Sequence, residues 1–548
     1  MALQTPGGLA GTPIIILKEG STRNQGKDAQ ARNIQAARII TEVVKATLGP
    51  RGMDKMLVDT LGDVTITNDG HEILKEIDVE HPIAKLIVEI AETQDDEVGD
   101  GTTTAVLLAG DLLQHAQTLL EKNVHATTIV AGYRKAAAEA LKILQDVAID
   151  VDLTDRPTLK QLAVTSMSGK VIGRTADHFA NVAIDAVQLI TDTRDNRPYA
   201  DKDDIQLVKK TGKSLFDTQL IHGIILDKEV VHPDMPKRIE HARIGLLDCP
   251  LEIKKTEMDA EIRIRDPLQM KAFLDEEARM LAAMVHTILT SGANVILGQK
   301  GIDDLAQHHL TKASVLAVQQ IKASDIEKLA KATGARVIST IDDLTADDLG
   351  VAQLVEERKI GDDKLVFIEG CQNPKAVAIL IRAGLERLID EAERALIDAV
   401  SVMIDVVKTS QLVAGGGSIE AELAKRIRDY AVTVGGREQL AIEAFAQAIE
   451  IIPITLAENA GFDIIDILVA IRAAHDSPEG FWYGVNVASG KVEDMMKNKV
   501  LEPLVVKQQA IKSAVEAAAM ILRIDDIIAS TKTPLPPPKG GYGGMPPY

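Results

Sequence analysis

Cysteine is almost absent from this 548-residue chain, which has only Cys249 and Cys371, far apart and in unrelated contexts. Two isolated thiols form neither a disulfide framework nor a zinc cluster, so we expect a reducing, cytoplasmic environment. No stretch approaches the roughly 18–20 uninterrupted apolar residues that cross a membrane, so we expect no membrane partner. Residues 1–13 lack a basic region followed by an apolar one, which predicts no secretory signal.

An excess of positive charge is also missing. The formal net charge is −20, with acidic residues spread along the chain, whereas nonspecific binding to nucleic acid needs a basic surface. Apolar residues make up 46% of the chain, enough to bury several cores. The length suggests about three or four domains. These features predict a large, acidic, soluble protein that binds no nucleic acid.

The hydrophobic pattern divides the chain into helix-rich flanks and a mixed centre. Helical spacing and short alternating runs predict helices over 28–48, 82–97, 102–122 and 126–148, and strands over 56–58 and 64–67. After about residue 150, short β-branched segments alternate with helix-like stretches, at 205–211, 223–231, 243–248, 294–298, 314–318 and 335–339. Helical periodicity returns over about 373–430 and from 436 onward. The pattern predicts an α/β centre inserted between helical flanks, followed by a disordered Pro/Gly-rich tail over 534–548.

The run from Gly99 to Thr104 (GDGTTT) stands directly before an apolar helix and is the most informative motif. Glycines let the backbone approach phosphate oxygens closely, and the first free amides of a helix point toward an anion. Three hydroxyl groups add donors, and Asp100 could hold Mg²⁺, which prefers oxygen ligands. A buried helix capped by Asp and Thr would give the same pattern, so both interpretations stay open.

Two further glycine turns give weaker signals. The turn from Thr47 to Gly52 follows a helix, where most such turns are C-caps, and Gly415 to Gly417 precede a helix that starts near Ser418. Three successive glycines indicate either close approach of a ligand or a hinge. The chain contains no GxxxxGK[ST] sequence, which excludes a Walker A loop.

Two aspartates are candidates for positioning the water that attacks a phosphoryl group. Asp69 lies in an Asn-Asp-Gly turn, and Asp398 interrupts an apolar helix. Turn chemistry explains the first equally well, and a solvated helix face explains the second. The residues alone therefore assign neither role.

Several stretches, in their order and spacing, resemble the group II chaperonins of archaea and the eukaryotic cytosol, and archaeal thermosome subunits in particular. The matching runs extend over nearly the whole chain: 47–59 (TLGPRGMDKMLVD), 67–70 (TNDG), 94–104 (QDDEVGDGTTT), 227–232 (DKEVVH), 300–308 (KGIDDLAQH), 436–444 (GREQLAIEA), 455–461 (TLAENAG), 490–495 (GKVEDM) and 510–526.

The resemblance implies the chaperonin fold, multidomain with α and α/β parts, in an ATPase that uses ATP and Mg²⁺, with K⁺ as a further candidate ion, to fold non-native proteins. The implied parts are a helical equatorial domain from 1–152 and 411–530, an intermediate hinge domain from 153–221 and 372–410, an α/β apical domain with a helical lid protrusion over 222–371, and a disordered tail over 531–548. The implied partners are unfolded client proteins and further subunits, in two stacked rings of eight or nine. A built-in lid would close after ATP hydrolysis.

Residue by residue, the resemblance implies roles around one nucleotide. Asp69 and Asp398 match the pair that positions the hydrolytic water, Asp100 matches the Mg²⁺ ligand, and Lys170 resembles a lysine that senses the γ-phosphate. The other matching positions contact the nucleotide: Leu48, Gly49, Pro50, Gly70, Gly101, Thr102, Thr103, Thr104, Gly416, Asn486 and Glu502. Because Asp398 and Lys170 belong to a different implied domain than Asp100, we expect hydrolysis to depend on domain closure.

Asp266 and Pro267 predict the start of a helix in the implied lid region. Its apolar residues at helical spacing are Met270, Phe273, Leu274, Leu281, Met284, Val285, Ile288 and Leu289. Met270 and Phe273 are candidates for adaptable contacts with client proteins, whereas we expect the later residues to be core.

The chain departs from the family pattern at three places: His71 follows the TNDG turn, Gln319 stands where paired arginines are common, and Ala383 replaces a glycine. Two alternative functions share some of these features. A small-molecule kinase would use the same phosphate motifs, but the match over the whole length argues against it. A ring scaffold without hydrolysis would have lost the aspartates that this chain retains.

Overall fold

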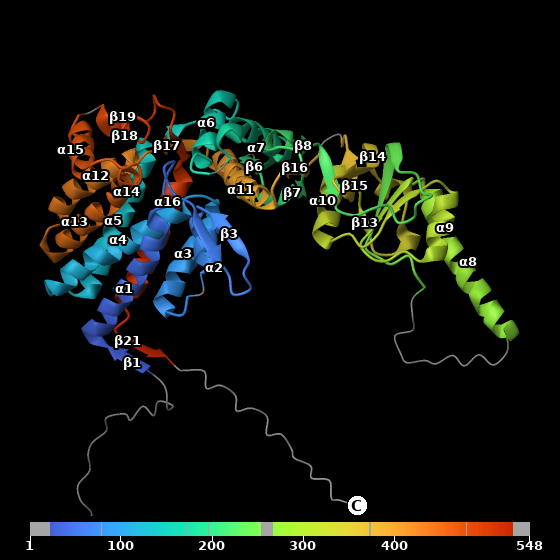
Figure 1. The fold of residues 1–548 in the computed structure, drawn as a ribbon, viewed down its shortest axis with the longest axis horizontal. Helices are drawn as coiled ribbons and strands as arrows, with labels where there is room; N and C mark the ends of the chain where they lie inside the picture. Colours follow the sequence, from blue (N-terminus) through green and yellow to red (C-terminus); the bar gives the residue numbers. More distant parts are fainter. Residues whose placement is uncertain are drawn as a thin grey trace, which may run out of the picture.

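The computed structural model describes residues 22–77, 79–170, 172–195, 197–253, 267–371, 374–477 and 479–529. Within these residues the chain folds into three bodies in a row, each with its own hydrophobic core (Figure 1). The tail predicted over 534–548 and the predicted cap Asp266 lie outside the described residues.

The first body is helical and combines both ends of the chain, coloured blue to cyan and orange to red in Figure 1. Its helices are α1 (Gly26–Lys45), α2 (Gly70–Glu76), α3 (Pro82–Val98), α4 (Thr102–Glu121), α5 (Ala126–Val147), α12 (Ser418–Val434), α13 (Gly436–Ile449), α14 (Ile451–Asn459), α15 (Ile464–His475) and α16 (Leu504–Leu522). The apolar run over 105–109 is fully enclosed, as expected for a helix without a polar face. Because α16 packs against α3, α4 and α5, the two ends of the chain share one core.

Short strands complete the first body. The two ends of the described chain pair antiparallel through β1 (Thr22–Gln25) and β21 (Asp526–Ala529). The remaining strands form the hairpin β2 (Lys55–Val58) and β3 (Val64–Thr67), the sheet of β4 (Ile149–Asp150), β17 (Gln411–Ala414) and β20 (Leu501–Pro503), and the hairpin β18 (Tyr483–Asn486) and β19 (Lys491–Asp494). By length and composition one helical segment among the described residues, Gly436–Asn459, could cross a membrane. Because 72% of its apolar window is buried inside the protein, the core explains its apolar character.

The second body joins the first to the third through two crossings of the chain. Its elements are α6 (Arg156–Ser166), α7 (Ala176–Ile190), α11 (Glu386–Thr409), the hairpin β5 (Asp192–Arg194) and β6 (Arg197–Tyr199), and the sheet β7 (Ile205–Thr211), β16 (Val377–Ala383) and β8 (Gln219–Ile221). The long helix α11 packs on α6, α7 and the sheet. The same helix also reaches β3 and α3 of the first body, so it lies across the boundary between them.

The third body is an α/β module formed by one continuous stretch of chain. Its sheet has the order β12 (Leu316–Val318), β11 (Val295–Gly298), β10 (Arg238–Leu247), β14 (Gly350–Ile360), β15 (Asp363–Glu369) and β9 (Gly223–Leu226), and β13 (Val337–Ile338) pairs with β10. Its helices are α8 (Pro267–Ser291), α9 (Asp304–Lys312) and α10 (Ala323–Thr333). In Figure 1, α8 projects beyond the sheet. Met270 and Phe273 on it are 56% and 45% exposed, whereas Leu281, Val285 and Ile288 are buried, as expected. The expectation that Leu274 and Leu289 are also core was wrong, because both are exposed.

Several predictions of secondary structure were wrong, and the strands β17 to β20 lie in stretches that were expected to be helical. The first helix ends at Lys45 rather than at 48, because the chain turns there and leads into Gly49 with φ at +81°. Residues 377–383, expected to be helical, form the fully buried strand β16, and an uninterrupted apolar run cannot be assigned by periodicity. The strands β14 and β15 were not predicted. The charged residues of β14 obscure its alternation.

Candidate nucleotide site

A cavity of about 390 Å³ lies where the first body meets α11. Residues from both ends and the middle of the chain line it. The lining includes every residue singled out for the nucleotide: Leu48, Gly49, Pro50, Asp69, Gly70, Asp100, Gly101, Thr102, Thr103, Thr104, Lys170, Asp398, Gly416, Asn486 and Glu502. The volume falls in the usual range for small-molecule sites.

Two long helices begin at the cavity, and a glycine in the left-handed region precedes each. Gly101, with φ at +78°, is the N-cap of α4, and Gly417, with φ at +75°, is the N-cap of α12; neither provides a side-chain cap. The first amides of α4 are therefore available to an anion, whereas the Ser418 amide at the start of α12 already donates to the Gly415 carbonyl at 3.3 Å. Gly70 lies so close to α4 that a Cβ atom there would be 2.5 Å from Thr103 Oγ1, so this approach requires glycine.

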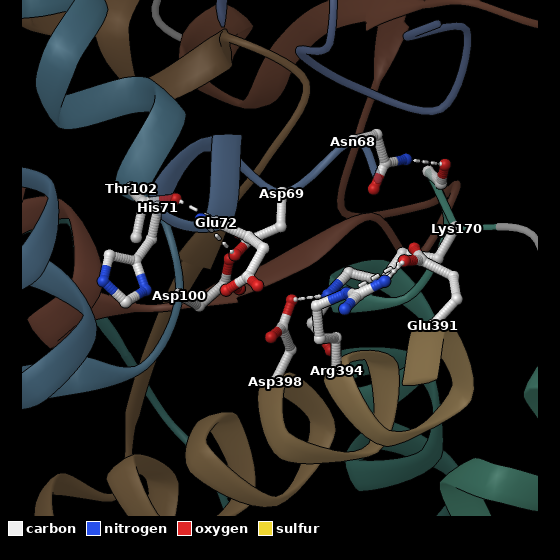
Figure 2. Close-up of polar contacts among 12 residues, drawn as sticks. Asn68, Asp69, His71, Glu72, Asp100, Thr102, Lys170, Glu391, Arg394 and Asp398 are labelled. Carbon is white, nitrogen blue, oxygen red and sulfur yellow. Dashed lines mark hydrogen bonds and ion pairs between the residues drawn. The ribbon is translucent and has the colours of Figure 1, made fainter. Parts of the chain in front are cut away.

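Three carboxylates from separate segments converge on the cavity (Figure 2). Asp69 caps α2 by accepting a hydrogen bond from the Glu72 amide at 3.2 Å. Asp100 lies in the turn between α3 and α4, and Asp398 comes from the middle of α11. Opposite them, Lys170 Nζ lies 2.6 Å from Asp398 Oδ2, and both side chains are largely buried.

Burial and mutual repulsion shift the titration of these groups. Burial raises the pKa of Asp398 well above its ordinary value. Lys170 lowers this pKa, and the neighbouring Asp100 and Asp69 raise it again in part. Burial also raises the pKa of Asp100 to about 6, with Glu502 as the next contribution. Burial alone would lower the pKa of Lys170, but Asp398 and Asp69 have the larger effect and raise it overall. Of the three lysines in the lining, Lys170 pairs with Asp398 and Lys507 with Glu502. Among the described residues Asp69 and Asp100 have no lysine at ion-pair distance, so the site has room for another cation beside them.

The donor set fits Mg²⁺ bound together with a phosphate chain. Among the described residues, no group of three or more His, Cys, Asp or Glu side chains is arranged to hold a metal by itself. One oxygen of Asp100 accepts a hydrogen bond from the Gly101 amide at 2.5 Å, which holds the carboxylate at the start of α4. Mg²⁺ commonly uses one or two carboxylates and completes its shell with phosphate oxygens and water, so Asp100 would be its protein ligand here.

Sequence reasoning missed three residues that support the site. Asn459 Nδ2 donates to the carbonyls of Lys45 at 3.0 Å and of Leu48 at 2.9 Å, which fixes the loop that carries Gly49 and Pro50. Asn68 donates to the carbonyl oxygen of Gly169, which ties the turn of Asp69 to the loop of Lys170. Both asparagines lie in runs that resemble the family, but nothing in those runs indicates which main-chain carbonyls their side chains contact.

The third missed residue is Lys507, a buried lysine in the otherwise apolar start of α16. Its Nζ lies 2.6 Å from Glu502 Oε2 and 2.8 Å from Glu420 Oε1. Burial opposes its charge, but the two carboxylates raise the pKa of Lys507 overall. A single lysine in an apolar run close to the predicted Glu502 is a signal that could have identified it.

The three departures from the family pattern have local partners. His71 Nδ1 lies 3.4 Å from Asp95 Oδ2. The side-chain oxygen of Gln319 accepts a hydrogen bond from the Ile302 amide at 2.8 Å, and Ala383 is fully buried at the end of β16. His71 is therefore in an ion pair or hydrogen bond beside the site without entering the cavity lining.

Comparison with known proteins agrees with this fold and site. Residues 40–532 match the TCP-1/cpn60 chaperonin family. The chain is 57% identical over 522 residues to thermosome subunit alpha of Archaeoglobus fulgidus, covering 95% of this chain and 96% of that protein. It is 56% identical over 522 residues to thermosome subunit beta of Sulfurisphaera tokodaii, covering 95% of each chain, and 54% identical over 520 residues to the thermosome subunit of Methanopyrus kandleri, again covering 95% of each.

The chain belongs to the TCP-1/cpn60 chaperonin family. It is a group II chaperonin subunit, an ATPase that couples ATP hydrolysis to protein folding, and it acts on client proteins within an oligomeric assembly.

Proposed function

We propose that the cavity between the first body and α11 is the ATPase site of this subunit. The observation that carries the proposal is the convergence of all the expected nucleotide residues, from distant parts of the chain, on one cavity. The amides at the start of α4 would bind phosphate oxygens, with Thr102, Thr103 and Thr104 adding hydroxyl donors. Asn486 and Glu502 come from the C-terminal part of the chain and also line the cavity. They would contact the adenosine.

Asp69 and Asp398 would position the attacking water. The raised pKa of Asp398 makes this carboxylate a better proton acceptor than an exposed aspartate. As the water oxygen bonds to the γ-phosphorus, one water proton passes to Asp398 and the bond to the ADP oxygen breaks. Lys170, now paired with Asp398, would interact with the γ-phosphate. Bound at Asp100, Mg²⁺ would neutralise charge on the phosphate oxygens.

Hydrolysis would depend on how the second body sits against the first. Asp398 and Lys170 both belong to the second body, whereas Asp69 and Asp100 belong to the first. The Asn68 contact to Gly169 is a direct link between them. A rotation that separates the bodies would remove the water-positioning group while leaving the phosphate-binding amides in place, which is a gating mechanism.

The three cores support the division into an equatorial domain (1–152 and 411–530), an intermediate domain (153–221 and 372–410) and an apical domain (222–371). The exposed Met270 and Phe273 on the projecting part of α8 suit contacts with varied unfolded chains during capture and lid closure. We further propose two stacked rings of eight or nine subunits in the cytoplasm.

The substitution Asp398→Asn tests the site. We expect ATP binding to remain near the parental level and hydrolysis to fall by a factor on the order of 10²–10⁴, because the variant loses the proton acceptor. The control is Asp390→Asn, which removes an ion pair with Lys209 from the partly exposed face of the same helix. ATP turnover and nucleotide binding are measured on the assembled particle. Parental turnover by Asp398→Asn would show that the water-positioning role is wrong.

A further inference from the structure

A second cavity, of about 510 Å³, lies at the junction of the second and third bodies and has no part in the nucleotide site. It is bounded by α7, by the turn between β7 and β8, by the end of β14 and by β16. In Figure 1 this junction lies between the labels β8 and β16 on one side and β14 and β15 on the other. Its charged lining residues are Lys213, Asp217, Lys359 and Arg382, with His178 beside them.

Arg382 is the buried member of this group and is only 6% exposed. Its Nε donates to the carbonyl of Gly212 at 3.1 Å, and its Nη2 donates to the carbonyl of Thr211 at 3.3 Å. Both partners are main-chain oxygens, and within the described part of the chain no carboxylate lies at ion-pair distance from the guanidinium. Neutral carbonyls satisfy two of its donors, and Asp217 in the same lining acts on its charge only from beyond ion-pair distance.

The two lysines of the cavity also lack ion pairs among the described residues, and both are exposed. The neighbouring Lys210 differs, because its Nζ lies 3.0 Å from Asp227 and 2.8 Å from Asp363. The one carboxylate in the lining, Asp217, is already engaged, since its Oδ2 accepts hydrogen bonds from both the amide and the hydroxyl of Ser214 at 2.9 Å. These bonds lower the pKa of Asp217 and keep it ionised.

The lining therefore holds three permanent cations and one anion, in a chain whose net charge is −20. The cations come from three segments that surround one space: the turn after β7, the end of β14, and β16. Such an arrangement matches a ligand with several charged oxygens pointing in different directions. A guanidinium with free donors recognises phosphate oxygens in pairs, and lysines add charge at the rim.

We propose that this cavity is a second anion site, which binds a phosphate-type dianion between the β7–β16–β8 sheet and the β14–β15 hairpin. The bound anion would connect the second body to the third, because Lys359 belongs to the third body and the other two cations belong to the second. The proposal does not depend on the assignment of the nucleotide residues.

Equilibrium dialysis of the assembled full-length protein against radiolabelled inorganic phosphate tests this site, with saturating ADP present to fill the nucleotide site. The test variant is Lys213→Gln combined with Lys359→Gln. The matched control is Lys312→Gln combined with Lys322→Gln, two exposed lysines of the third body that likewise lack ion pairs among the described residues. We expect phosphate binding by the parent and the control, and binding about tenfold weaker in the test variant, because it lacks two of the three cations that surround the cavity.

A second variant, Arg382→Gln, should bind no phosphate, provided that its circular dichroism spectrum matches that of the parent. If this variant does not fold, the result for Lys213→Gln combined with Lys359→Gln tests the proposal. Competition by glycerol 3-phosphate would identify organic phosphomonoesters as ligands, and its failure to compete would restrict the site to free phosphate. The proposal is overturned by equal binding in the test variant and its control, or by a parent that binds no phosphate beyond the nucleotide site.

Discussion

The substitution Asp405→Asn should stabilise this protein at neutral pH. Asp405 lies on α11 about two turns after Asp398 and is 5% exposed. Its Oδ2 has no hydrogen-bond partner among the described residues. Burial raises the pKa of this carboxyl to about 8, and the nearby Asp100 adds to the shift against Lys408.

The direction of the pH dependence follows from the raised pKa. In the unfolded chain an aspartate titrates near pH 3.9, so between about pH 4 and pH 8 the folded protein retains a proton that the unfolded chain releases. The associated stability is fully present below about pH 4 and is lost as the pH rises through about 8. From the unfolded pKa of about 3.9 to pH 7 is about three pH units, and each unit costs about 1.4 kcal/mol of folding stability. The loss at pH 7 is therefore roughly 4 kcal/mol. At pH 5 it is only about 1.5 kcal/mol.

Asparagine has nearly the same shape and stays neutral, so it should restore most of the lost stability at pH 7 and little at low pH. Large assemblies often unfold irreversibly, so the assay compares apparent melting temperatures at one scan rate, near pH 5 and near pH 7. We expect an increase of several degrees near pH 7 that shrinks near pH 5. Asp390→Asn, at the more exposed start of the same helix, is the control and should shift neither value appreciably. A lower melting temperature for Asp405→Asn, or a gain independent of pH, would refute the reasoning.

Three further predictions concern other parts of the molecule. Gly101→Ala should weaken ATP binding by at least about tenfold, because a φ of +78° strains an alanine and its Cβ would lie 2.8 Å from a methyl group of Val506. Gly334→Ala is the control, with φ at +76° and open space around it. It should lower only the stability, by about 1–2 kcal/mol. Lys507→Met leaves the buried Glu420 and the partly buried Glu502 without their cation, so we expect a loss of about 3–5 kcal/mol at neutral pH, measured as a lower apparent melting temperature at one scan rate. Replacing Met270 and Phe273 together with serine should reduce capture of a denatured client protein, measured by cosedimentation, and leave basal ATP turnover unchanged.

The sequence predicted the helical flanks and the inserted α/β centre well, because apolar spacing and glycine turns are local signals. The start of α4 at Thr102 and of α12 at Ser418 were both identified by their glycines. The strand β16 was not, because a run buried on both faces has no period to read. Contacts that depend on the folded chain could not be predicted either.

For the nucleotide site, composition and local motifs indicated a phosphate-binding turn and two ambiguous aspartates. Their convergence could be expected only from the family resemblance, since Asp69 and Asp398 are far apart in the chain and carry no local signature. The supporting residues Asn459 and Asn68 act through main-chain carbonyls of other segments. Such bonds leave no pattern in the sequence, because any donor at the right place in the fold would make them.

The distribution of the three cores along the chain has a consequence for biosynthesis. The core of the third body uses residues from Ile224 to Ala376 without interruption, so it can assemble on the ribosome as soon as that stretch has emerged. The core of the first body combines Ile34 to Val147 with Val413 to Leu522. Its first half must wait, with apolar helix faces uncovered, until nearly the last residue has been translated. A protein that shelters unfolded chains is thus itself exposed to aggregation for most of its own synthesis.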